Sequence, residues 1–207
     1  MLDFARIGAT PAAHHPFSYF VAGPVVNGDD LDEISRDFPL LDSPGLFTLS
    51  ELSCGPAFTR LIEDLRLPRL RGLMEEKFDI DLAGKPLMIT VRGQCQAKDG
   101  RIHVDSTDKL VTGLLYLNEP IWTGEGGCLR LLRGPDSLDD PIAEIAPIGG
   151  TMLVFRRSDN SWHGHAPFEG RRRAVMFNWM RSETALRKNL LRHKLSAFFK
   201  SGLGVGQ

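Results

Sequence analysis

His103 and Asp105 are separated by a single valine in the stretch GRIHVDSTD, residues 100–108. On an extended backbone, residues i and i+2 project from the same side about 7 Å apart, so the imidazole and the carboxylate can converge on one metal ion. The motif alone is weak, because a histidine beside an aspartate is often only a hydrogen-bonded surface pair. A metal site therefore requires a third ligand from elsewhere in the chain.

A second histidine-containing segment, FRRSDNSWHGHAPF, supplies candidates for that third ligand. His163 lies 58 positions after Asp105 (163 − 105), inside a predicted strand that a β-sandwich could bring back to the first pair. Two imidazoles and one carboxylate on one face of a metal, with three positions open, form the arrangement used by non-heme Fe(II) oxygenases. His165 would face the same side of the strand as His163, so spacing alone leaves both histidines as candidates.

The elements that must position these groups change character near residue 85. Before it, three segments predict helices, because they begin with acidic residues or proline and carry apolar residues at three-to-four spacing. These segments are DDLDEISRDF, PAFTRLIEDL and PRLRGLMEEKF. After it, seven short β-like runs are separated by glycine, proline and aspartate, without the helices that parallel strands would need between them. The runs are LMITVRGQCQ, KLVTGLLYLN, GCLRLL, IAEIAPI, GTMLVFRR, WHGHAPF and RAVMFNWM.

The size of the chain fits one domain, because 207 residues at 42% hydrophobic can bury one good core. We expect a single domain over residues 1–207. Its parts are a helical region over about 1–85, a mainly β sandwich or jelly-roll core over about 86–180, and an amphipathic C-terminal helix over about 183–200.

Charge and cysteine content narrow the class of protein. The formal net charge is −1 and no broad cationic field is present, which argues against nucleic acid as a partner. The three cysteines are far apart and form no C-x-x-C pair, which argues against disulfides and structural zinc. No signal-peptide pattern or long apolar window occurs, so we expect a cytoplasmic protein without a membrane partner. The oligomeric state has no signal in the sequence.

An ordered series of five motifs resembles the 2-oxoglutarate and Fe(II)-dependent dioxygenase superfamily, in its prolyl 4-hydroxylase-like branch. The resemblance covers roughly residues 86–180. The motifs are H-V-D at 103–105, Y-L-N at 116–118, G-G-C-L-R-L at 126–131, P-I-G-G-T-M-L-V-F at 147–155 and R-R-A-V at 172–175. The resemblance implies a double-stranded β-helix, or jelly roll, with flanking N-terminal helices and a C-terminal helix. The count of β-like runs agrees with that fold.

The resemblance also implies roles for individual residues. His103, Asp105 and His163 match the iron ligands of the family, while His165 becomes a residue of the surrounding pocket. Tyr116 matches the tyrosine that contacts 2-oxoglutarate.

Three consecutive arginines, 171–173, cannot all point the same way, because neighbours on a strand alternate faces. Periodicity leaves both faces open, and the motif favours Arg172 over Arg173. An arginine suits this role because its planar fork pairs bidentately with a carboxylate, here the distal carboxylate of 2-oxoglutarate.

The activity implied by the resemblance is hydroxylation of an unactivated C–H bond, coupled to the oxidative decarboxylation of 2-oxoglutarate to succinate and carbon dioxide. The implied cofactor is Fe(II), with 2-oxoglutarate and dioxygen as cosubstrates and ascorbate as a candidate reductant. A protein or peptide side chain such as proline is the leading substrate class, closely followed by a free amino acid or other small molecule. The alternatives are a zinc-dependent hydrolase, since the same ligands can bind catalytic zinc, and a non-catalytic β-sandwich binding module.

The strand before the H-V-D motif departs from the family pattern. Many relatives carry a tyrosine and a glycine there, whereas this chain has ITVRGQCQAKDGR. Gln94 and Gln96 would share one side of that strand with Arg92, and their amides both donate and accept hydrogen bonds. We therefore expect Gln94 or Gln96, together with Trp122 at the rim, to contact the prime substrate. The missing tyrosine weakens the case for proline as that substrate.

Overall fold

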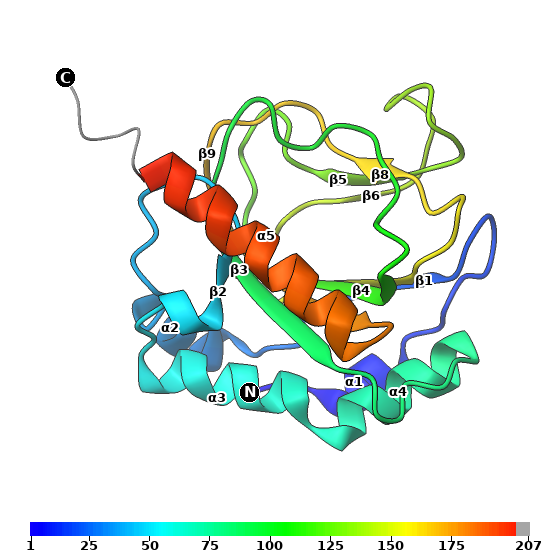
Figure 1. The fold of residues 1–207 in the computed structure, drawn as a ribbon, viewed down its shortest axis with the longest axis horizontal. Helices are drawn as coiled ribbons and strands as arrows, with labels where there is room; N and C mark the ends of the chain where they lie inside the picture. The colour runs from blue at the N-terminus through cyan, green and yellow to red at the C-terminus, as the bar shows by residue number, and fades with distance from the viewer. Residues whose placement is uncertain (202–207) are drawn as a thin grey trace.

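Two antiparallel sheets form the centre of the protein, shown in Figure 1 for a computed structural model that describes residues 1–201, with side chains described for residues 1–192. The larger sheet has the strand order β1-β7-β4-β9-β3-β2, and the smaller has the order β6-β5-β8. The strands are β1 (Tyr19–Ala22), β2 (Phe47–Thr48), β3 (Leu87–Cys95), β4 (Lys109–Tyr116), β5 (Leu129–Leu132), β6 (Pro141–Ile145), β7 (Met152–Arg156), β8 (His163–Gly164) and β9 (Gly170–Met180). The fold is the predicted double-stranded β-helix, or jelly roll.

Helices cover the outer face of the larger sheet. They are α1 (Phe4–Ala9), α2 (Gly28–Arg36), α3 (Pro56–Arg66) and α4 (Pro68–Phe78), with a short 3₁₀ helix η1 (Leu49–Glu51) between α2 and α3. The prolines that open α3 and α4 sit where a missing backbone N–H costs nothing. The buried faces of these helices share one hydrophobic core with the sheet, in which Phe58 and Leu61 pack with Val91 and Phe177.

The last helix, α5 (Glu183–Ser201), confirms the predicted C-terminal helix. It runs diagonally across the molecule in front of β3 (Figure 1) and contacts β2, β3 and β9. Within residues 1–201, no helix has the length and apolar character needed to cross a membrane.

The N-terminal region contains strands as well as the three predicted helices. Tyr19–Ala22 pairs with β7 and Phe47–Thr48 pairs with β3, so the region before residue 85 contributes both edges of the larger sheet. The first helix, Phe4–Ala9, was also missing from the sequence-based description. These elements are two to six residues long, which is too short for a periodic pattern to develop.

The inner face of the larger sheet packs against the smaller sheet. This second cluster joins Leu114 and Phe155 of the larger sheet to Leu129 and Leu131 of the smaller one. β4 and β9 are neighbours at the middle of the larger sheet, with Thr112 opposite Asn178 and Tyr116 opposite Ala174. The polar side chains among these inward-facing positions therefore lie between the sheets.

Candidate metal centre

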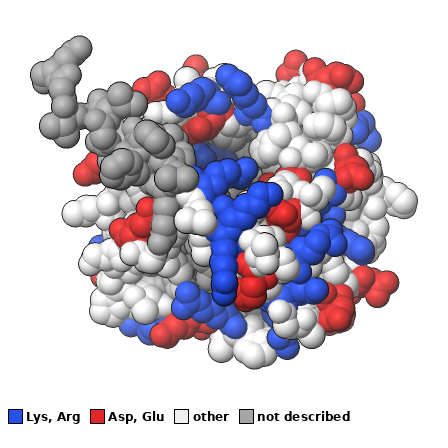
Figure 2. Space-filling model, in the orientation of Figure 1, with Lys and Arg blue, Asp and Glu red and all other residues white. Residues whose placement is uncertain are grey.

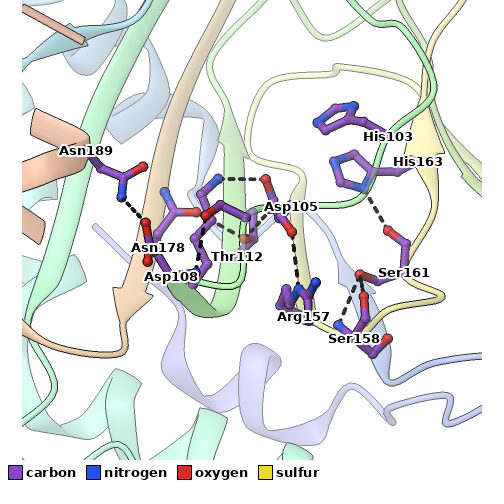
Figure 3. A network of polar contacts seen from close by, with 12 residues as sticks. His103, Asp105, Asp108, Thr112, Arg157, Ser158, Ser161, His163, Asn178 and Asn189 are labelled. Carbon is purple, nitrogen blue, oxygen red and sulfur yellow. Dashed lines mark hydrogen bonds and ion pairs between the residues drawn. The ribbon is translucent and has the colours of Figure 1, made fainter. Parts of the chain in front are cut away.

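His103, Asp105 and His163 form a group that could hold one metal ion. Each offers one ligand atom, and these atoms all lie within 4.8 Å of one another. The two histidines are backbone neighbours, since the N–H of each donates to the carbonyl of the other at 3.0 Å. Their rings lie side by side, with 4.3 Å between centroids (Figure 3). The structure thus brings together the three residues that the sequence predicted as ligands.

The hydrogen bonds of the two imidazoles fix which nitrogen is free. Nδ1 of His103 lies 2.8 Å from the carbonyl of Arg101, and Nδ1 of His163 lies 3.0 Å from the carbonyl of Ser161. Because a carbonyl only accepts, Nδ1 must carry the hydrogen in both rings. Nε2 of each ring is then the lone-pair donor, as a metal requires.

Asp105 is held by three neighbours. Lys109 Nζ donates to Oδ1 at 2.7 Å, Thr112 Oγ1 donates to Oδ2 at 2.6 Å, and Arg157 Nε donates to the backbone carbonyl at 3.1 Å. Burial by itself would raise the pKa of this carboxyl, but the charge of Lys109 and the hydrogen bonds from Lys109 and Thr112 outweigh it and hold the pKa well below its usual range. Asp105 is therefore an ionised ligand at neutral pH.

His163 is kept neutral by its surroundings. Burial lowers its pKa to about 4, with a further lowering from His103 and an opposing effect from Asp105. A neutral imidazole is the form that binds metal. Nitrogen donors from imidazole and an oxygen donor from carboxylate are ligands that suit Fe(II), so the donor set fits that ion.

His165 lies outside the three-residue donor group but lines the same cavity. Its Nδ1 donates to the carbonyl of Ala166 at 2.9 Å, and its backbone N–H donates to the carbonyl of Gly100 at 2.8 Å. Burial, followed by the charge of Arg172, lowers its pKa to about 4. A Cβ on Gly100, which has a φ of +84°, would lie 2.4 Å from the imidazole, so only glycine allows this close packing.

The metal group opens into a cavity of about 380 Å³ that also contains Arg172. Arg172 is 4% exposed, and its Nε donates to the carbonyl of Gly127 at 2.8 Å. One Nη2 hydrogen is donated to the hydroxyl of Tyr116 at 3.1 Å. A guanidinium has five N–H donors, so three remain for an anion in the cavity. Tyr116 is fully buried and does not itself line the cavity, and this burial raises its pKa.

Arg173 points to the opposite side of β9. Its Nη1 donates to the carbonyl and the hydroxyl of Ser35 at 3.2 and 3.1 Å, and its guanidinium lies 4.4 Å from the ring centroid of Phe38. Arg173 therefore binds the helical layer. Of the two arginines that the strand pattern left open, Arg172 is the one in the cavity.

The residues predicted to contact the prime substrate lie elsewhere. Gln94, Gln96 and Trp122 are absent from the cavity lining, although Arg92 belongs to it. The pairing of β3 with β9 shifts register between Arg92 and Gln94, where β9 has one extra residue, and Gln96 lies beyond the end of β3. Trp122 packs on Phe168 with 4.8 Å between ring centroids, and its Nε1 donates to the carbonyl of Gly126 at 3.0 Å.

Several supporting residues were missed by the sequence analysis. Thr112 lies between Asp105 and Asn178, as Figure 3 shows: its one hydroxyl hydrogen goes to the carboxylate at 2.6 Å, so the Asn178 amide, 3.0 Å away, can bond to it only by donating its N–H. Thr112 and Asn178 are each 1% exposed. The available signal was a polar residue inside each of two apolar runs, KLVTGLLY and AVMFNWM, because a buried polar side chain needs a partner.

A protein-family model matches part of the chain. Residues 93–181 match the family model of the 2OG-Fe(II) oxygenase superfamily, and this range contains all three metal-site residues and Arg172. The match favours neither a zinc-dependent hydrolase nor a binding module. No curated protein matches the sequence significantly.

Solved structures share the fold at low sequence identity. A prolyl-4-hydroxylase from Pseudomonas putida has a TM-score of 0.55 at 15% identity, over 86% of this chain and 98% of that one. A viral collagen prolyl hydroxylase from Paramecium Bursaria Chlorella virus-1, solved with 2-oxoglutarate, has a TM-score of 0.53 at 16% identity, over 79% and 95%. HygX from Streptomyces hygroscopicus, solved with nickel and 2-oxoglutarate, has a TM-score of 0.53 at 14% identity, over 80% and 82%.

Proposed function

We propose that this chain, which belongs through residues 93–181 to the 2OG-Fe(II) oxygenase superfamily, is an Fe(II)- and 2-oxoglutarate-dependent hydroxylase in which His103, Asp105 and His163 bind the iron. The observation that carries the proposal is the cavity itself. It combines two neutral imidazoles and an ionised carboxylate with a buried arginine that has unused donors. A hydrolytic zinc site needs the two imidazoles and the carboxylate but has no need of the buried arginine.

Bound Fe(II) supplies the chemistry that a protein side chain lacks, namely activation of dioxygen coupled to oxidative decarboxylation of 2-oxoglutarate. One oxygen atom of O₂ ends in the new hydroxyl group and the other in succinate, with carbon dioxide released. The protein contributes geometry, charge and a partly enclosed cavity.

Separate residues bind 2-oxoglutarate and hold the metal ligands in position. Arg172 is assigned to the distal carboxylate of 2-oxoglutarate, because its planar fork matches a carboxylate and lies inside the cavity. Tyr116 holds Arg172 in place through the 3.1 Å hydrogen bond and the packing of the guanidinium over its ring, at 5.1 Å from the centroid. Thr112 and Lys109 hold the carboxylate of Asp105, and their hydrogen bonds stabilise its ionised form.

The prime substrate is assigned to the class of peptide or protein side chains, or amino acids resembling them. Two of the solved structures described above are named as prolyl hydroxylases, one of them a collagen prolyl hydroxylase. The cavity of about 380 Å³ lies at the small end for ligand pockets. It must hold 2-oxoglutarate as well, so the reacting end of the substrate is about the size of one side chain.

The test is the metal dependence of succinate formation. Protein freed of metal is loaded with Fe(II) or Zn(II) under argon, mixed with 2-oxoglutarate, and exposed to oxygen while succinate is measured. We expect slow succinate formation with Fe(II) and oxygen only, since Zn(II) has no redox chemistry. Absence of succinate with Fe(II), together with hydrolysis of ester or amide substrates by the Zn(II) form, would support a hydrolase instead.

A further inference from the structure

The cavity wall carries more positive than negative charge. Among residues 1–192, whose side chains the structure describes, the lining contains four cationic side chains against two carboxylates, which leaves two positive charges in excess. The cations are Arg92, Lys109, Arg172 and Arg192, and the carboxylates are Asp99 and Asp105. The protein as a whole has a formal net charge of −1, so this excess is a local property of the cavity.

The cofactor and cosubstrate do not remove that excess. A divalent metal ion contributes two positive charges, and 2-oxoglutarate contributes two negative charges through its two carboxylates. Their sum is zero, so the cavity remains cationic after both have bound. A ligand that enters next to them is favoured if it is an anion.

Three of the four cations already have defined partners. Lys109 pairs with Asp105 at 2.7 Å, and Arg92 pairs with Asp99 at 2.6 Å. Arg172 is bonded to Gly127 and Tyr116 and is assigned to 2-oxoglutarate. These three cations are already paired or assigned, so they are not available to bind a further ligand.

Arg192 is different in both position and partners. It lies on α5, which contacts β3 and β9, and among the described side chains it is the one cation of the cavity lining that comes from outside the β core. Among the side chains of residues 1–192, it has no hydrogen bond or ion pair. Figure 2 shows Lys and Arg side chains gathered over α5 and around the hollow above it. An exposed, unpaired guanidinium at the edge of a cavity is free to bind an incoming anion.

We propose that the prime substrate carries a carboxylate close to the C–H bond that is oxidised, and that Arg192 binds this carboxylate. The inference rests on the proposed function, because it assigns the third ligand of the same cavity. The carboxylate has two sources, either a free amino acid or other small acid, or an acidic residue or C-terminus of a peptide. Both sources present the same group to Arg192, and the size of the molecule attached to it distinguishes them.

The experiment measures binding without turnover. Protein loaded with Zn(II) and 2-oxoglutarate is titrated calorimetrically with N-acetyl derivatives of the twenty amino acids, each as the free acid and as the amide. The best acids are then compared with dipeptides that end in the same residue. We expect at least one acid to bind about tenfold or more tightly than its amide, and its affinity to fall as salt rises. Tighter binding of the dipeptide acid would identify a peptide substrate, and weaker binding a small acid.

The variant R192Q removes the charge and keeps a good helix-forming residue. We expect it to weaken binding of the acid about three- to tenfold, as for a partly exposed ion pair, and to leave the amide unchanged. R187Q is the matched control, because Arg187 is exposed on the same helix and absent from the cavity lining. The R187Q variant should bind the acid with the same affinity as the unmodified protein.

The inference is overturned if no acid binds, if acids and amides bind equally, or if R192Q and R187Q bind the acid equally. A failure of the proposed function has a separate signature. In that case the Zn(II) protein does not bind 2-oxoglutarate, and the Fe(II) protein forms no succinate.

Discussion

The two faces of β9 are both largely buried, yet they serve different parts of the molecule. One face packs into the helical layer, where Arg173 binds Ser35 and Val175, Phe177 and Trp179 join the larger core. The other face points between the sheets and contributes Arg172, Met176 and Asn178 to the cavity. The two faces of β9 therefore differ in what they contact, although both are largely buried.

The contrast separates stability from chemistry along one strand. The helical face buries apolar surface, which is the main favourable contribution to folding. The cavity face instead buries a guanidinium and an amide, which stabilise little even when hydrogen-bonded and cost much when left without partners. Substitutions on one face should thus change the free energy of unfolding, and those on the other should change ligand binding.

On the cavity side, the largest effect on binding is expected at the metal centre. His163→Ala should weaken Fe(II) binding by more than about 100-fold, because a three-residue site loses both a donor and the geometry of its open positions. His165→Ala should change the affinity less than about tenfold, since His165 lies outside the donor group. Anaerobic equilibrium dialysis with Fe(II) measures both. The reverse ranking would make His165 the distal ligand.

The next effect belongs to the helical side. Phe177→Ala should lower the free energy of unfolding by about 3–5 kcal/mol, because the ring is fully buried and packs edge-on against Trp179 at 6.0 Å between centroids. Urea unfolding followed by circular dichroism measures the change. The folded variant should retain its affinity for 2-oxoglutarate within about threefold. A large loss of that affinity would show that the two faces are not separable.

Lowering the pH should destabilise the metal-free protein, because the cavity contains two buried neutral histidines. His163 and His165 have pKa values of about 4 in the fold and an ordinary value of 6.5. Between pH 6.5 and 4 the unfolded chain binds protons that the folded protein does not, so stability falls as pH falls. For His163 the loss is about 2 kcal/mol by pH 5.

Urea midpoints at pH 7.5 and 5 measure this loss. His165→Asn should reduce it, because one of the two neutral histidines is removed. Asp105 does not contribute in this window, since its lowered pKa stabilises the fold at all pH values above its ordinary 3.8. A midpoint that stays constant between pH 7.5 and 5 would contradict the neutral state of the buried histidines.

The smallest effect is expected when lysine replaces each of the two arginines in turn. Arg172→Lys keeps the charge but loses the planar fork, so 2-oxoglutarate binding to the Zn(II) protein should weaken by about 1–3 kcal/mol while the metal still binds. Arg173→Lys should leave that affinity unchanged and slightly destabilise the fold, through the lost bonds to Ser35. The opposite ranking would place the cosubstrate on the other side of β9.

Residue spacing together with the family resemblance was sufficient to predict the metal-binding group. The i, i+2 relation of His103 and Asp105 on extended backbone pointed to two ligands, and the family resemblance selected His163 over His165 as the third; the structure places the three ligand atoms within 4.8 Å of one another. The longer β-like runs and three of the N-terminal helices were equally readable, because each is long enough for its period to appear. The short strands β1 and β2 carry no such pattern, and only pairing with distant strands defines them.

Which side of a strand meets the cavity was decided by the tertiary structure alone. Alternation told which residues of β9 share a face, but both faces are buried, so hydrophobicity could not say which one meets the cavity. The packing of the helices against Arg173 and Phe177 makes that choice, and it leaves Arg172 to the site. On β3, alternation had grouped Arg92 with Gln94 and Gln96, but only Arg92 lines the cavity, because β9 has one extra residue opposite the Arg92–Gln94 segment and Gln96 lies beyond the end of β3. A sequence pattern encodes local periodicity, whereas the contacts that select a face or shift a register come from segments far away in the chain.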